Sequence, residues 1–218
     1  MLIHLAKVID GPTVAALRKR LDKAQFRDGK LSAGYAAKSV KQNQQSEGDD
    51  LSQQVIGLIQ ERLLKHPVWV QAAQPKHFGR CMLNRYGVTD HYGWHVDDAW
   101  MQGIRTDLSF TVSLSALAEY DGGALAIQDT SGERSWRLDT GDVLLYPSHY
   151  LHQVEAVSRG ERVAMVGWLQ SLVRDPAKRE LLFELSQALE HEFAQQQKSA
   201  QFDRLSKVYQ NLQRQWLE

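Results

Sequence analysis

The chain has 218 residues, of which 43% are apolar and 24% are charged. These values are close to the averages for globular proteins and exclude a disordered, collagenous or membrane-spanning chain. Basic and acidic residues number 26 each, so the basic excess that most nucleic-acid-binding domains carry is missing, and we expect no nucleic-acid partner.

The first third of the chain predicts two helices separated by a polar segment. Apolar residues recur at helical spacing between Val14 and Ala24, after Asp10-Gly11-Pro12. A second helix is predicted over residues 51–65, with Pro67 ending it. Residues 27–50 between them are polar and contain three glycines, which is typical of a long surface loop or lid.

Residues 68–172 have a different pattern, in which short runs of β-branched and aromatic residues alternate with glycine and proline. Such a pattern predicts a sandwich or jelly roll. Helical spacing returns after Asp175-Pro176. We therefore expect a mainly β fold with flanking helices: a jelly-roll core, N-terminal helices and a C-terminal helical appendage.

The expected domain boundary lies at the end of this β region. Residues 1–174 would form one domain, with a β core at about 68–172, and residues 175–218 a helical segment. Apolar stripes in that segment favour packing on the β core, and a homodimer interface is the second interpretation.

The single cysteine, Cys81, excludes an intrachain disulfide and a thiolate metal cluster. The first residues lack a basic start followed by an apolar run, and no segment approaches the roughly 18 apolar residues of a membrane-spanning helix. From these observations we expect a cytoplasmic protein that does not contact a membrane.

A pair of metal-ligand residues, His95 and Asp97, lies in the segment Tyr92-Gly93-Trp94-His95-Val96-Asp97. On a strand, the two-residue period would place both side chains on one face, where they could bind a single ion. The H-x-D pattern is common by chance, so this pair predicts a metal site only if a third ligand is present.

Two histidines farther along, His149 and His152, could each supply that ligand. They follow residues 141–147, which predict a strand ended by proline, and spacing alone does not choose between them. Two histidines and one carboxylate occupy one face of an octahedral ion and leave the other positions open, as a non-haem iron(II) oxygenase requires. A structural zinc site would instead close its coordination.

Arg162 lies ten residues beyond His152, after a predicted turn at Ser158-Arg159-Gly160. The turn would return the chain as an antiparallel strand and bring Arg162 towards His152. A guanidinium pairs bidentately with carboxylates, so Arg162 could hold the far end of a dicarboxylate that chelates the metal.

Other chemically capable residues near these motifs have simpler interpretations. His91 is expected to be a loop histidine with a local hydrogen bond, and Asp98 to face away from the metal pair. The tryptophans at 94, 100, 136 and 168 are expected in the core or in a pocket wall.

These motifs together resemble the bacterial PKHD-type hydroxylases, which belong to the prolyl and lysyl hydroxylase-like iron(II)- and 2-oxoglutarate-dependent dioxygenases. The resemblance covers nearly the whole chain. It rests on Arg85-Tyr86-Gly87, residues 91–97, Gly122-Gly123-Ala124-Leu125, residues 141–148, Leu151-His152-Gln153-Val154 and residues 160–164. It implies a double-stranded β-helix that hydroxylates a C–H bond while 2-oxoglutarate and dioxygen become succinate and carbon dioxide.

The resemblance also implies roles for individual residues. Iron would be held by His95, Asp97 and His152, and 2-oxoglutarate by Arg162 and Tyr86. L-Ascorbate would keep the metal ferrous. The sequence does not name the substrate, and two other functions share these residues: a cupin-like metalloenzyme that does not use 2-oxoglutarate, and a non-catalytic sensor of iron or 2-oxoglutarate.

Overall fold

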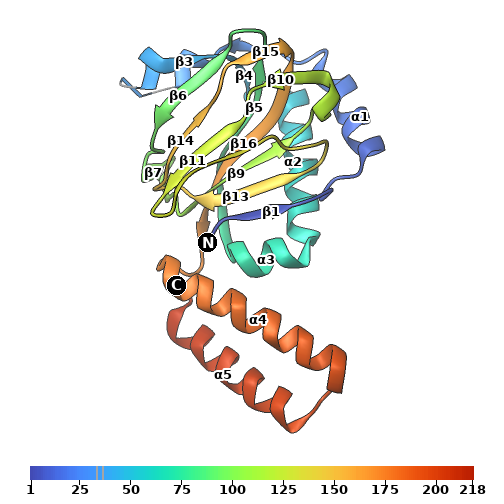
Figure 1. Ribbon diagram of the computed structural model, residues 1–218, viewed down its shortest axis with the longest axis vertical. Coiled ribbons are helices and arrows are strands. Elements are labelled where there is room, and N and C mark those ends of the chain that lie inside the picture. Colours follow the sequence, from blue (N-terminus) through green and yellow to red (C-terminus); the bar gives the residue numbers. More distant parts are fainter. Residues whose placement is uncertain (33, 36) are drawn as a thin grey trace.

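Two antiparallel sheets face each other in the computed structural model (Figure 1), which describes residues 1–32, 34–35 and 37–218. The seven-stranded sheet has the order β1 (Ile3–Leu5), β13 (Val143–Pro147), β9 (Leu108–Ser113), β16 (Arg162–Ser171), β5 (Pro75–Tyr86), β4 (Gln44–Ser46) and β2 (Arg27–Asp28). The five-stranded sheet has the order β12 (Gly132–Trp136), β11 (Leu125–Asp129), β14 (Leu151–Val154), β6 (His91–His95) and β3 (Lys41–Gln42). Two ribbons complete the β structure: β10 (Tyr120–Gly122) with β15 (Val157–Gly160), and β7 (Trp100–Met101) with β8 (Ile104–Arg105).

Three helices contribute to the main hydrophobic core with the seven-stranded sheet: α1 (Gly11–Leu21), α2 (Asp50–Lys65) and α3 (Pro67–Ala73). The first two begin at aspartate caps, Asp10 and Asp49, whose carboxylates accept a backbone N–H of the first turn. Pro67 ends α2 as predicted, and it also begins α3, because proline is well tolerated at the first helical position. The predicted N-terminal helices are therefore present, with a third beside them.

Alternate side chains of the strands point to opposite faces of the sheet, one face towards this core and the other towards the space that separates the two sheets. On β9, Leu108, Phe110 and Val112 belong to the core shared with the helices, and Ser109 and Thr111 line the inter-sheet cavity, which Phe110 also borders. A second, smaller apolar cluster fills the rest of that space: Tyr86, Leu125, Ile127, Leu138, Leu144, Tyr146, Val154 and Val157. One face of each central strand thus stabilises the fold, and the other builds the cavity.

The polar segment between the first two helices is not the long loop that its composition predicts. It holds β2, β3 and β4 and two short 3₁₀ helices, Gly29–Ser32 and Ala37–Val40. Its strands pair with β5 of one sheet and β6 of the other, so the segment joins the edges of both sheets. Strands of two or three residues are too short to produce a readable period, which is why the β structure begins well before residue 68.

The C-terminal residues form a helical hairpin of α4 (Pro176–Gln196) and α5 (Ala200–Trp216), which projects away from the sheets (Figure 1). Helix α4 packs against α3, and its Phe183 lies against the main hydrophobic core, as the favoured interpretation of the apolar stripes expects for this helix. The chain end returns to the β domain, where the Glu218 backbone N–H donates to the Leu172 carbonyl at 2.9 Å. Among the described residues, no helix combines the length and the apolar character needed to cross a membrane. The predicted mainly β fold with a helical appendage is confirmed.

Candidate functional site

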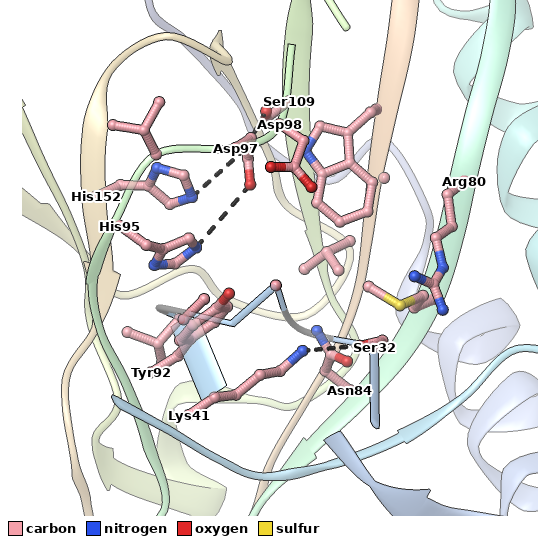
Figure 2. Close-up of a pocket in the computed structure, with 18 of the residues that line it drawn as sticks. Ser32, Lys41, Arg80, Asn84, Tyr92, His95, Asp97, Asp98, Ser109 and His152 are labelled. Atoms are coloured by element: carbon pink, nitrogen blue, oxygen red, sulfur yellow. Dashed lines mark hydrogen bonds and ion pairs between the residues drawn. The ribbon is translucent and has the colours of Figure 1, made fainter. Parts of the chain in front are cut away.

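A cavity of about 570 Å³ opens between the two sheets and contains the expected metal ligands. Figure 2 shows His95 and His152 directed towards Asp97, with Lys41 and Asn84 on the other side of the same space. The lining comes from both sheets and from the segment that joins their edges. Trp94, exposed by 37%, and Trp100, exposed by 66%, also belong to the lining.

The three ligand groups converge as a metal site requires. One ligand atom from each of His95, Asp97 and His152 lies within 4.8 Å of the others. The Asp97 carboxylate oxygens lie 4.0 Å from His95 Nε2 and 3.6 Å from His152 Nε2. Antiparallel pairing of β14 with β6 places the two histidines directly opposite each other. Strand pairing therefore brings the two histidines together, and Asp97, just after β6, adds the carboxylate. The donors of this two-histidine, one-carboxylate set fit iron(II).

Hydrogen bonds fix the orientation of all three side chains. His95 Nδ1 donates to the Gly93 carbonyl at 2.8 Å, and His152 Nδ1 donates to the Tyr150 carbonyl at 3.0 Å. Because a carbonyl can only accept, each neutral ring keeps its Nε2 lone pair free for a metal. The Ser109 hydroxyl donates to Asp97 Oδ2 at 2.6 Å and so restrains the carboxylate.

The aromatic surroundings of His95 also favour a neutral ligand. Its ring stacks on Tyr92, with the centroids 3.6 Å apart and the planes 15° from parallel. Burial, followed by the neighbouring His152, lowers the pKa of His95 to about 4. His95 is therefore neutral near pH 7, which is the form that binds a metal.

The competing residues lie outside this group of three side chains. His149 is exposed and packs edge-on against Tyr150. His91 binds the Thr89 carbonyl through Nδ1 at 3.0 Å, as expected of a locally bonded histidine. Asp98 does not face away, since it lines the cavity beside Asp97 (Figure 2). Strand β6 ends at His95, so the alternation assumed for Asp97 and Asp98 does not extend to either of them.

Arg162 reaches the site by a different path from the one predicted. Instead of returning beside β14, the chain forms β15, passes Gly160 at φ +73°, and enters the opposite sheet as β16. There Arg162 lies opposite Tyr86 of β5. The predicted hairpin was wrong, because the residues of a turn do not show which sheet the next strand will join.

The Arg162 guanidinium is a buried cation without an ion-pair partner in the described parts of the chain. The side chain is 5% exposed, its Cζ lies 5.3 Å from the Tyr86 ring centroid, and Nη1 has no hydrogen-bond acceptor. It is not among the residues that line the cavity, whereas Tyr86 is. Burial raises the pKa of Tyr86 to about 12, and the nearby Arg162 opposes that rise.

Tyr146 connects the arginine to the metal group electrostatically. Burial, and then the Asp97 carboxylate, raise the pKa of the Tyr146 hydroxyl well above its usual value, while Arg162 lowers it. The Tyr146 ring also meets the His152 ring edge-on at 5.2 Å. The Tyr146 hydroxyl is therefore influenced by both the Asp97 carboxylate and the Arg162 guanidinium.

The side chains of this cavity that sequence reasoning missed include Ser109, Tyr146, Lys41 and Asn84. One signal was available for Ser109, because Ser109, Thr111 and Ser113 alternate with apolar residues on a buried strand. Polar residues on one face of a buried strand indicate a face that meets a polar cavity. For Lys41 the polar segment offers no comparable pattern.

Replacing Ser109 is expected to weaken metal binding without removing a ligand. Loss of a hydrogen bond to a metal-binding carboxylate typically costs about 10–100-fold in metal affinity, and Ser109→Ala should fall in this range. Ser113→Ala is the matched control, because Ser113 is equally buried on the same face but donates to the Ser115 carbonyl. Titration of iron(II) into both variants checks this, and equal affinities would contradict it.

Comparison with family models gives two matches. Residues 81–170 match the 2OG-Fe(II) oxygenase superfamily, and residues 176–218 match the PKHD-type hydroxylase C-terminal domain. Among curated proteins, the chain is 48% identical to a PKHD-type hydroxylase of Idiomarina loihiensis, with 99% of each chain covered. It is 44% identical to one of Shewanella oneidensis and 40% identical to one of Gloeothece citriformis, each over the full length of both chains.

Solved structures with the same architecture are more distant in sequence. A Pseudomonas putida prolyl-4-hydroxylase aligns with a TM-score of 0.58 at 18% identity, covering 78% of this chain and 92% of that one. A Trichoplax adhaerens prolyl hydroxylase, solved with a hypoxia inducible factor fragment, aligns with a TM-score of 0.62 at 14% identity, covering 83% and 86%. These likenesses confirm the jelly-roll fold.

Proposed function

Because this chain belongs to the PKHD-type hydroxylases of the 2OG-Fe(II) oxygenase superfamily, we propose that His95, Asp97 and His152 hold its iron and that Arg162 and Tyr86 bind 2-oxoglutarate. The protein is a 2-oxoglutarate-dependent dioxygenase, a hydroxylase that releases succinate and carbon dioxide. Its substrate is unidentified. The observation that carries the residue assignment is the convergence of the three ligand atoms within 4.8 Å.

The donor chemistry fits iron(II) with open coordination positions. Two imidazole nitrogens and one carboxylate are present, and no fourth His, Cys, Asp or Glu joins the group in the described chain. Bound iron(II) supplies the dioxygen chemistry, and the protein positions and shields the reactants. The backbone carbonyls of Gly93 and Tyr150 and the Ser109 hydroxyl hold the ligands ready for the metal.

The co-substrate assignment is supported by the unsatisfied guanidinium. A buried Arg162 with an unbonded Nη1 lacks the anion that a guanidinium in such a place requires. A carboxylate of 2-oxoglutarate would supply it, with the Tyr86 hydroxyl beside it. The test is anaerobic addition of 2-oxoglutarate to the iron(II) protein, which should produce the metal-to-ligand charge-transfer absorption of the chelate. Succinate should then form when oxygen is admitted.

The remaining assignments concern the protein as a whole. We propose that residues 1–174 form the dioxygenase domain and residues 175–218 a helical segment that begins at the Asp175 cap. L-Ascorbate, the reductant that the family resemblance implies, would keep the iron ferrous. A reducing compartment such as the cytoplasm suits that state.

A homodimer through the C-terminal hairpin is the proposed assembly. Helix α5 has no buried residue, and Leu181, Phe193 and Val208 leave 59%, 45% and 50% of their surfaces exposed on the hairpin. Leu181→Glu combined with Val208→Glu should convert a dimer to a monomer in analytical ultracentrifugation. Lys207→Gln, an exposed neighbour, should not. A wild-type monomer at all concentrations would exclude this assembly.

A further inference from the structure

Lys41 is a buried cation in the cavity whose described partners are all uncharged. It is 4% exposed, and its Nζ donates to Ser32 Oγ at 3.1 Å and to Gln45 Oε1 at 3.2 Å. No carboxylate of the described chain lies within ion-pair distance. The ammonium has three N–H groups, so one is left for a ligand.

The strand pairing holds this amine close to the metal group. Lys41 lies on β3, opposite Tyr92 of β6. Its Nζ is 4.9 Å from the centroid of the Tyr92 ring, and that ring stacks on His95. In Figure 2, the Lys41 amine and the Asn84 carboxamide point into the space below the metal ligands. A molecule that occupies this space lies between Lys41 and the metal.

The other cation of the lining is already neutralised. Arg80 binds Glu47 through two hydrogen bonds, Nε to Oε2 at 2.6 Å and Nη2 to Oε1. Asp98 lies at the cavity but is exposed to solvent. Among the described residues, Lys41 is therefore the cation without an ion pair on this side of the cavity. Burial, followed by repulsion from Arg80, lowers the pKa of Lys41 to about 8, although the more distant carboxylates of Glu47, Asp97 and Asp28 oppose this shift.

The charges of the loaded site would not compensate Lys41 either. With the assignments proposed above, iron(II) and Arg162 are balanced by Asp97 and the two carboxylates of 2-oxoglutarate. One positive charge, that of Lys41, is left over in a low-dielectric space, where an unpaired charge is costly. A single negative charge on the substrate would balance it.

We propose that Lys41 recognises a carboxylate of the substrate, so that this hydroxylase acts on carboxylate-bearing molecules. This inference rests on the proposed function, because it places the substrate beside the iron and 2-oxoglutarate. It assigns Lys41 to the substrate and not to the co-substrate. A phosphate would bring more negative charge than one lysine balances.

Pairs of N-acetyl amino acids and their primary amides test the proposal as probes. They are titrated into the anaerobic protein loaded with iron(II) and 2-oxoglutarate, and the shift of the charge-transfer absorption reports binding beside the metal. The wild type is expected to bind at least one acid about tenfold or more tightly than its amide. Lys41→Met and Lys41→Gln should each reduce the affinity for that acid to that for the amide, and should leave the affinity for 2-oxoglutarate unchanged.

Lys38→Met is the matched control, because Lys38 lies in the same segment and is exposed to solvent. It removes the same charge and should keep the preference for acids, while circular dichroism establishes that every variant is folded. The proposal is overturned if the wild type does not bind acids more tightly than amides. It is also overturned if the Lys41 variants lose affinity for acids and amides equally, or if they lose affinity for 2-oxoglutarate to the same extent. Tighter binding of inorganic phosphate than of any acid would also overturn it. Failure of the wild type to form the charge-transfer band would instead refute the proposed function, and this inference with it.

Discussion

Arg162→Ala is expected to leave iron(II) binding intact and to weaken 2-oxoglutarate binding by ~2–5 kcal/mol, the usual loss when one partner of a desolvated charge pair is removed. Arg162 is 5% exposed and has an unbonded Nη1, so a carboxylate paired with it would be shielded from water. Lysine keeps the charge but lacks the planar fork, so Arg162→Lys should be intermediate. Anaerobic titration of 2-oxoglutarate, followed by charge-transfer absorption, measures each affinity.

Pyruvate distinguishes loss of distal-carboxylate recognition from a general disruption of the binding site. It lacks the group that Arg162 is proposed to bind, so it should bind poorly to the wild type and be much less affected by Arg162→Ala. The two ligands and two proteins form a double-difference cycle. Arg159→Ala is the matched control, because Arg159 is nearby in sequence but is exposed and paired with Asp121. Equal losses for both ligands, or no loss for either, would refute the pairing.

Alanine at His95, Asp97 or His152 is expected to abolish stoichiometric iron(II) binding, because two remaining ligands hold the ion too weakly. The β fold should persist, since none of the three belongs to either apolar cluster. Isothermal titration calorimetry measures binding, and circular dichroism measures the fold.

His149→Ala is the control for the third ligand. His149 is a histidine three positions before His152, but it is exposed and lies outside the ligand group. Its variant should bind iron(II) as the wild type does. If His149→Ala lost iron and His152→Ala retained it, the assignment of the third ligand would be wrong.

The metal ligands could be proposed from sequence because each lies in a short motif. His95 and Asp97 are two residues apart, and the choice of His152 over His149 came from the family resemblance. The same locality allowed the class of fold to be predicted, since the change from helical spacing to short strand runs is visible within a few residues. The prediction that Asp98 faces away from the metal pair was wrong, because the strand ends at His95 and the two-residue alternation ends with it.

The strand that carries Arg162 could not be assigned to a sheet from local sequence patterns. The predicted turn residues Ser158, Arg159 and Gly160 belong to strand β15, and only the φ of +73° at Gly160 shows a change of backbone conformation there. Strand β16 pairs with β5 and β9, whose sequences lie far from it along the chain. Pairing partners are decided by the burial of both strand faces in the folded protein, which no local window contains.

The sequence by itself was enough to propose the metal-binding residues, and it determined the mainly β class and the helical tail, because side-chain chemistry and periodicity are local properties. Only the tertiary structure decided that β14 and β6 pair to place His152 opposite His95, and that Ser109 restrains Asp97. It also decided that Lys41, in a segment that reads as a surface loop, is buried in the cavity. Burial and electrostatic environment depend on neighbours that are distant along the chain, so the unpaired charge of Lys41 in the cavity is evident only in the folded protein.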